Sequence, residues 1–325
     1  MKYTLKSGIG TLLCAAAAAV TAITLSLPTP AAAGVESDDP IKLALNEWTG
    51  QHITTRIAGR VLSEMGYTVE YIAAGYYPQI QAMQDGSLTA TLEIWTSNIG
   101  DGYQKALDTG NIEIIGDLGV KPREGWFYPA YMEEQCPGLP DWKALNDCAI
   151  KFSVPDTVPK GRFVDYPAEW GTTNKDRIDA LGLNYQSIPA GSEGSLIAEI
   201  KSAFATKAPL LAMFWEPHWV HAVYDLKLLQ LPAYEPACYE DASWGMNPDK
   251  TYDCDWDGTA ATDKVAWIGL KDKWPGAYKM LQAYQLTNAA QAAMMRAVDV
   301  DGRDIEDVIT EWLDANESTW KAWTM

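Results

Sequence analysis

The sequence is poor in basic residues and in histidine. Lys and Arg total 25 against 43 Asp and Glu, which gives a formal net charge of −18, and there are only three histidines. A nucleic-acid-binding protein needs the opposite balance, because its basic side chains must neutralise phosphate groups. The composition therefore excludes nucleic acid as an expected partner.

Long apolar runs are missing beyond the first 33 residues. A membrane-spanning helix needs about 20 continuous apolar residues, so the mature chain is not expected to be membrane-inserted. In residues 1–33, Lys2 and Lys6 precede an apolar stretch that ends in Ala31-Ala32-Ala33, a pattern typical of a cleavable secretory signal peptide. Its removal takes away two basic residues and no acidic ones, so the net charge becomes −20. The expected location is the periplasm.

Cysteine is scarce, and four remain after residue 33: Cys136, Cys148, Cys238 and Cys254. An even number in an exported chain indicates two disulfides. Three pairings are possible, and we predict the local one, Cys136–Cys148 with Cys238–Cys254, because it closes two short loops. Zinc binding is the alternative, but no Cys-x-x-Cys occurs and the histidines are not spaced with the cysteines as ligands would be.

A catalytic signature is also missing. The segment Gly191-Ser192-Glu193-Gly194-Ser195 is not a nucleophile elbow, and the glycine spacing fits neither a P-loop nor a dinucleotide-binding turn. We therefore predict a binding protein that is not an enzyme and requires no cofactor. An exported hydrolase with a scattered site stays open as an alternative.

Tryptophan, by contrast, is abundant, with 14 residues against five Phe. Residues 41–45, 67–72 and 88–95 are predicted as strands, and 52–65 and 78–85 as helices, because the apolar periodicity alternates between the two types. This βαβαβ order favours a parallel sheet. Trp48 and Trp95 then both lie at carboxyl ends of strands, where α/β proteins usually bind ligands.

A third tryptophan, Trp215, follows another predicted strand. The apolar run 209–213 leads into Phe214-Trp215-Glu216-Pro217-His218-Trp219. Two interpretations fit: the aromatic rings are core, or they form a binding surface at a strand end.

The mature length, a little under 300 residues, is more than one core usually carries, so two lobes are expected. We place the first lobe at 34–127 plus 229–325 and the second at 128–228, with the crossing near Gly125-Trp126-Phe127-Tyr128-Pro129-Ala130-Tyr131. Two long amphipathic helices, 277–297 and 305–320, are predicted to close the first lobe.

Four of these segments together resemble a known family, the substrate-binding proteins of ABC importers for glycine betaine, choline and related methylated osmolytes. They are Asn46-Glu47-Trp48-Thr49, Leu92-Glu93-Ile94-Trp95, the crossing segment, and the Phe214–Trp219 segment. The resemblance implies an α/β two-lobed venus-flytrap fold of the type II-like periplasmic-binding class, each lobe a mainly parallel sheet flanked by helices. It also implies a permease and an ATPase as partners.

The resemblance further implies a box of aromatic rings between the lobes. Carried over by position, Trp48, Trp95 and Trp215 belong to this box, with a fourth ring from Trp126, Tyr131 or Trp170, and Glu93, Glu216 and His218 lie beside it. Ring faces suit a methylated ammonium, which cannot donate hydrogen bonds, at about 0.5–1 kcal/mol per exposed contact and ~2 or more when desolvated.

Two positions bear on which osmolyte is bound. Choline-binding relatives carry an aspartate where this chain has Gly50, and glycine betaine binders carry a neutral residue where it has Glu216. A ligand without a carboxylate is therefore favoured, and trimethylamine N-oxide fits, because a protonated Glu or an indole N–H could donate to its oxygen. Glycine betaine, choline and dimethylsulfoniopropionate rank below it. A carbohydrate-binding protein is the alternative class that also uses tryptophan platforms.

One further motif indicates a metal. Asp253, Asp255 and Asp257 alternate before Gly258, as in the opening of an EF-hand calcium loop. The closing glutamate is replaced by Lys264. Either a structural Ca²⁺ is bound with other ligands, or the segment is an acidic turn held by the Cys238–Cys254 bridge.

Overall fold

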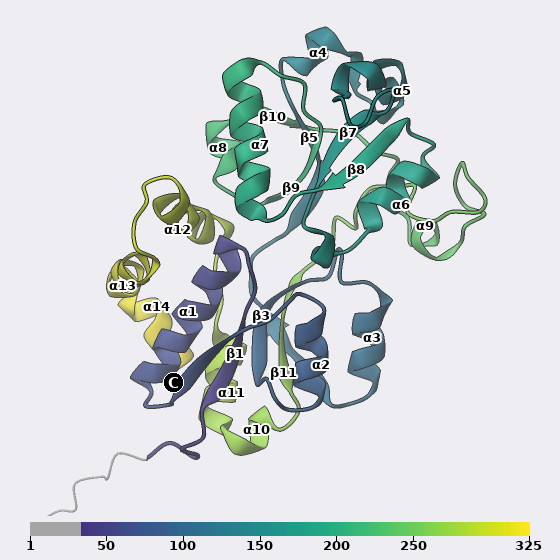
Figure 1. Ribbon diagram of the computed structural model, residues 1–325. Helices are drawn as coiled ribbons and strands as arrows, with labels where there is room; N and C mark the ends of the chain where they lie inside the picture. The colour runs from purple at the N-terminus through teal and green to yellow at the C-terminus, as the bar shows by residue number, and fades with distance from the viewer. Residues whose placement is uncertain (1–33) are drawn as a thin grey trace, which may run out of the picture. The chain divides into compact units, whose positions relative to one another are not determined.

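The computed structural model describes residues 34–325 and contains two five-stranded sheets (Figure 1). The predicted signal peptide, 1–33, lies outside the described residues. In spatial order the first sheet is β2 (Val69–Ala73), β1 (Ile41–Leu45), β3 (Ala90–Trp95), β11 (Thr262–Trp267) and β4 (Ile112–Asp117). The second is β10 (Leu226–Leu228), β5 (Arg123–Pro129), β9 (Ala212–Glu216), β7 (Gly161–Asp165) and β8 (Tyr185–Pro189).

Helices flank each sheet. Those of the first lobe are α1 (Thr49–Glu64), α2 (Pro78–Gln84), α3 (Asp101–Asp108), α10 (Leu270–Lys273), α11 (Pro275–Ala283), α12 (Asn288–Asp299), α13 (Ile305–Ala315) and α14 (Glu317–Trp323). The remaining ones are α4 (Met132–Gln135), α5 (Leu145–Cys148), α6 (Thr173–Ala180), α7 (Glu193–Thr206), α8 (Val220–Val223) and α9 (Ala237–Glu240). The short strand β6 (Pro137–Pro140) lies outside both sheets.

The two-lobed α/β fold is confirmed, and each sheet is mixed, with four strands running in one direction and the fifth reversed. In the first sheet β1 pairs in parallel with β2 and β3, while β11 pairs antiparallel with β3 and β4. In the second, β7 pairs in parallel with β8 and β9, while β5 pairs antiparallel with β9 and β10. The difference arises because β11 and β5 follow connections from the other lobe and enter each sheet in the reverse direction.

The crossing between the lobes falls earlier than residue 128. All seven residues of β5 (Arg123–Pro129) lie in one strand, and residues 123–127 pair with β9 of the second sheet. The predicted boundary of 127/128 therefore cuts through this strand. The lobe boundaries otherwise stay a prediction.

Helix ends follow local chemistry. Gly66, at φ +97°, follows α1, and Gly86, at φ +76°, follows α2, as glycine does where the chain leaves a helix in a left-handed conformation. At the other end, Ser192 caps α7 by accepting the backbone N–H of Ser195, and Asp304 caps α13 in the same manner.

The helix predicted over 277–297 is two helices, α11 and α12. The chain turns at residues 284–287, where the buried ammonium of Lys264 donates to the carbonyl oxygens of Gln282 at 2.9 Å and Tyr284 at 2.5 Å. Thr287 then caps α12 by accepting the N–H of Ala290. The helix predicted over 305–320 is likewise divided, at Asn316, into α13 and α14.

Both predicted disulfides are present. Cys136 is bonded to Cys148 and Cys238 to Cys254. The second bridge closes a long loop that Arg177 of α6 also holds, since its guanidinium donates to the carbonyl of Cys254 at 2.7 Å and lies 3.8 Å from the ring centre of Trp256.

Candidate functional site

A pocket with an aromatic wall lies where segments of the two sheets meet. Its cavity is small, at about 30 Å³. From the first lobe come Trp48 after β1, Tyr76 before α2, Trp95 at the end of β3 and Asn98 shortly after it. The remaining lining residues lie on β5, on β9 or in the segment that follows β7. The full lining is Trp48, Tyr76, Trp95, Asn98, Glu124, Tyr166, Trp170, Met213 and Trp215.

Four tryptophans form the box. The ring centre of Trp170 lies 5.2 Å from that of Trp48 and 5.6 Å from that of Trp215, edge to face in both cases. All four rings are buried, with 5–8% of each residue exposed. Desolvated ring faces attract a methylated cation more strongly than exposed ones, at ~2 kcal/mol or more per contact.

Glu93 accepts hydrogen bonds from two of these rings. Its Oε1 accepts the indole N–H of Trp48 at 2.9 Å and of Trp95 at 3.0 Å, and its Oε2 accepts Thr54 at 2.8 Å and Gln291 at 2.9 Å. Burial raises the pKa of Glu93, while these four bonds act in the opposite direction. Glu93 does not line the pocket and positions the rings that do.

Glu124 is the acidic group of the pocket. It lies on β5 opposite Trp215 of β9, and its carboxylate accepts Ser97 Oγ and, at 2.7 Å, Asn98 Nδ2. Burial raises its pKa to about 7, against the opposing effect of these hydrogen bonds and of the Arg177 charge. Near neutral pH this carboxyl group is therefore available both as a hydrogen-bond donor and as an anion.

A family model described as the substrate binding domain of an ABC-type glycine betaine transport system matches residues 39–315. The chain belongs to this family. Its members are substrate-binding domains of an ABC-type importer, so the chain is a substrate-binding protein and not an enzyme.

Individual relatives agree with the family. This osmolyte-binding protein is 29% identical over 299 residues to the trimethylamine N-oxide-binding protein of Pelagibacter ubique (strain HTCC1062), a match covering 89% of this chain and 92% of the relative. Its fold is similar to the glycine/betaine/L-proline-binding protein from Borrelia burgdorferi (TM-score 0.71, 19% identity, 88% and 97% covered). It is also similar to an ABC-transporter choline-binding protein in complex with choline (TM-score 0.69, 17% identity, 87% and 91% covered).

The structure does not bring Trp126 or Tyr131 to the pocket. Trp126 is fully buried against Phe163, with ring centres 4.6 Å apart, and its indole N–H donates to Asn174 at 2.8 Å. Tyr131 donates its hydroxyl to backbone carbonyls at Ala203 and Ala208. Of the three predicted candidates for the fourth ring, Trp170 is the one that lines the pocket.

Glu216 and His218 are also outside the lining. Successive side chains of a strand point to opposite faces, so on β9 Trp215 faces the pocket and Glu216 faces away from it. Glu216 therefore does not line the pocket, and Glu124 is the acid beside the rings. His218 faces Glu193 and Asp299 instead.

Sequence reasoning missed five of the lining residues. They lie on strands or loops next to the recognised motifs and share no other feature. Glu124 directly precedes the crossing segment, and its place in the strand two residues before Trp126 was the signal that could have found it. The others carry no comparable pattern. The five are Tyr76, Asn98, Glu124, Tyr166 and Met213.

The three aspartates of the proposed calcium loop serve separate turns. Asp253 accepts the N–H of Met246, Asp255 that of Trp256, and Asp257 that of Thr259. Within residues 34–325, the three side chains that lie close enough together to hold a metal ion are Glu193, His218 and Asp299, and none of them belongs to this loop. Calcium binding stays a prediction.

Across residues 34–325, none of the helices is both long enough and apolar enough to span a bilayer.

Proposed function

We propose that this osmolyte-binding protein captures trimethylamine N-oxide in the periplasm and delivers it to the permease and ATPase of its importer. The trimethylammonium head would lie against Trp48, Trp95, Trp170 and Trp215. Ring faces attract the methylated head of every one of these amines. The choice among the ligands therefore depends on the protein group that contacts the rest of the ligand.

Glu124 is the observation that carries the choice. The oxide oxygen needs a hydrogen-bond donor, and the indole N–H groups of Trp48 and Trp95 already donate to Glu93. With a pKa raised to about 7, Glu124 is partly protonated at neutral pH and can donate its O–H to the oxide. The 29% identity to a protein named for trimethylamine N-oxide supports the same choice.

The same carboxyl group argues against glycine betaine, because the ionised form would repel the ligand's carboxylate. It makes choline the second candidate, since an ionised Glu124 attracts a cation that carries no anionic group. Dimethylsulfoniopropionate carries a carboxylate and ranks with glycine betaine.

The test is calorimetry with trimethylamine N-oxide, glycine betaine, choline and dimethylsulfoniopropionate side by side, with a maltodextrin as the carbohydrate control. We expect trimethylamine N-oxide to bind most tightly. Glu124→Leu should weaken this binding at least tenfold, whereas Glu216→Gln, the matched acid outside the pocket, should leave it unchanged. Tightest binding to glycine betaine would reject the proposal and leave the transport class intact.

A further inference from the structure

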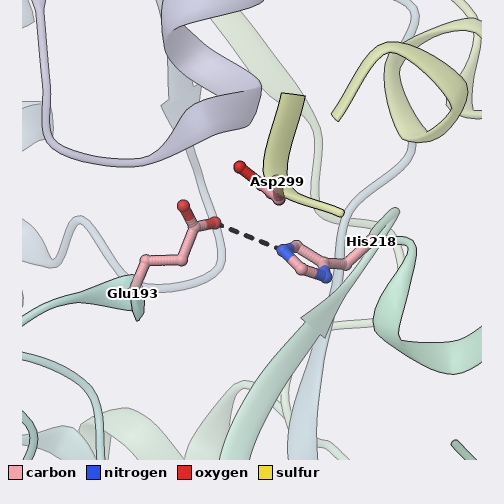
Figure 2. Close-up of side chains that lie close together, drawn as sticks. All are labelled: Glu193, His218 and Asp299. Carbon is pink, nitrogen blue, oxygen red and sulfur yellow. Dashed lines mark ion pairs between the residues drawn. The ribbon is translucent and has the colours of Figure 1, made fainter. Parts of the chain in front are cut away.

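A second cluster consists of three polar side chains that do not line the pocket, and Figure 2 shows how they lie relative to one another. It joins Glu193, the first residue of α7, His218, which follows β9, and Asp299, the last residue of α12. One possible ligand atom from each residue lies within 4.8 Å of the others. Glu193 and His218 belong to the second lobe and Asp299 to the first, so the cluster is complete only when the lobes meet.

Two atoms of the cluster are buried without hydrogen-bond partners. His218 Nε2 and Glu193 Oε1 are 3.3 Å apart, and their side chains are 0% and 6% exposed. Neither atom forms a hydrogen bond with the other or with any other described group. Two ligand atoms bonded at 2.0–2.1 Å to one tetrahedral zinc ion are separated by about 3.3 Å, so this spacing suits two ligands of a shared ion.

The outer oxygens of the cluster are held in place. Glu193 Oε2 accepts the backbone N–H of Thr49 at 2.9 Å. Asp299 accepts the Thr49 hydroxyl at 2.8 Å on Oδ1 and the Trp219 indole N–H at 2.8 Å on Oδ2. Hydrogen bonds of this kind orient the ligands of metal sites.

The cluster also carries uncompensated charge. It contains two carboxylates, and among the ion pairs of residues 34–325 neither is paired with Lys or Arg. Glu193 is buried and Asp299 is half-buried, and a cation between two such carboxylates would offset the cost of holding them away from water.

We propose that Glu193, His218 and Asp299 form a binding site for a divalent transition-metal ion, for which Zn²⁺ is the ion best suited to one imidazole and two carboxylates, with water as the fourth ligand. Because its ligands come from both lobes, the ion would hold the lobes together. Thr49 directly follows Trp48 of the box, so the site lies next to the bound osmolyte. Metal and osmolyte should therefore strengthen each other's binding reciprocally.

The competing occupant is a proton. His218 Nδ1 accepts the N–H of Val220 at 3.2 Å, which places the ring proton on Nε2 in the metal-free protein. The ion must displace that proton, so metal binding and a proton-only cluster are distinct outcomes.

The experiment is a calorimetric titration of chelator-treated protein with Zn²⁺ alone, without osmolyte. We expect one ion per chain, and at least tenfold weaker binding in His218→Asn and Asp299→Asn. Asp301→Asn, an exposed neighbour of the cluster, and Asp255→Asn, in the acidic loop, are the matched controls and should bind the ion as the wild type does. Absence of binding at tens of micromolar Zn²⁺, or unchanged binding in Asp299→Asn, would overturn the site and mean a proton-only cluster.

X-ray absorption of the zinc-loaded wild type keeps the test independent of variants that fold poorly. One histidine among nitrogen and oxygen ligands is expected, and a coordination shell without histidine would contradict the site. Repeating the titration with each methylated amine then measures the coupling, with tighter Zn²⁺ binding expected alongside the amine that binds. Because the first titration contains no amine, failure of the metal site and failure of the proposed ligand can be told apart.

Discussion

Glu93 connects two tryptophans that are 47 residues apart in the chain. A single carboxylate oxygen accepts both indole N–H groups, so the ring planes of Trp48 and Trp95 are oriented by one buried group before any ligand arrives. Binding groups that are held in advance lose less conformational entropy when the ligand is bound. This is why an acid that does not line the pocket matters to it.

Trp170 offers the cleanest test of the box. Its ring contacts are with Trp48, Tyr166 and Trp215, so Trp170→Ala should weaken osmolyte binding at least tenfold, about 1.4 kcal/mol, with little change in the apo melting temperature. Trp126→Ala is the matched control, because its ring is core: it should lower the free energy of unfolding by about 3–5 kcal/mol. Calorimetry and thermal melting separate the two effects, and wild-type affinity in Trp170→Ala would remove that ring from the site.

Glu124 predicts an unusual pH dependence of binding. Its pKa is raised to about 7 by burial, so the donating neutral form is present below pH 7 and is lost as the pH rises through that value. Affinity for trimethylamine N-oxide should therefore fall ~10-fold between pH 6 and pH 8, since each unit above the pKa costs about 1.4 kcal/mol. Choline should show the opposite trend, because it gains from the ionised form.

Glu124→Gln is the control for this dependence. The amide keeps an N–H donor at the same position but does not titrate, so binding of trimethylamine N-oxide should persist and become flat across the same pH range. A wild-type pH profile that is already flat would show that Glu124 does not donate to the ligand.

At the scale of elements, the long loop after α9 is held by its disulfide and by Arg177. Its three aspartates bond to separate backbone N–H groups. We therefore expect millimolar calcium to leave the melting temperature unchanged relative to chelator. A rise that Asp255→Ala abolishes, and that Asp299→Asn does not, would instead establish the calcium site predicted by the sequence.

A contact between two elements also explains why the helix predicted over 277–297 is divided into α11 and α12. Its apolar periodicity continues through the break, but the ammonium of Lys264, from β11, takes the carbonyls of Gln282 and Tyr284. These groups come from separate elements of the fold. No local pattern could have indicated that contact.

At the scale of the whole molecule, the pocket is built from both lobes, and its closure should accompany binding. Trp48 and Trp95 come with the first sheet and Trp170 and Trp215 with the second. We expect the radius of gyration from small-angle X-ray scattering to decrease when saturating osmolyte is added. Trp170→Ala at the same ligand concentration is the control, and identical wild-type profiles with and without ligand would contradict closure.

The sequence alone was sufficient to predict the two-lobed α/β class, both disulfides, and the meeting of Trp48 and Trp95, whereas Trp215 was placed beside them by the resemblance to the family. These features depend on local periodicity, on loop length and on the rule that parallel strands end at one edge. Tertiary structure alone decided that Trp170 and not Trp126 lines the pocket, that Glu124 and not Glu216 lies in its wall, and that Glu193, His218 and Asp299 meet. The physical reason is that each of these depends on which face of a strand points inward or on contacts between distant segments, and neither has a local signature in the chain.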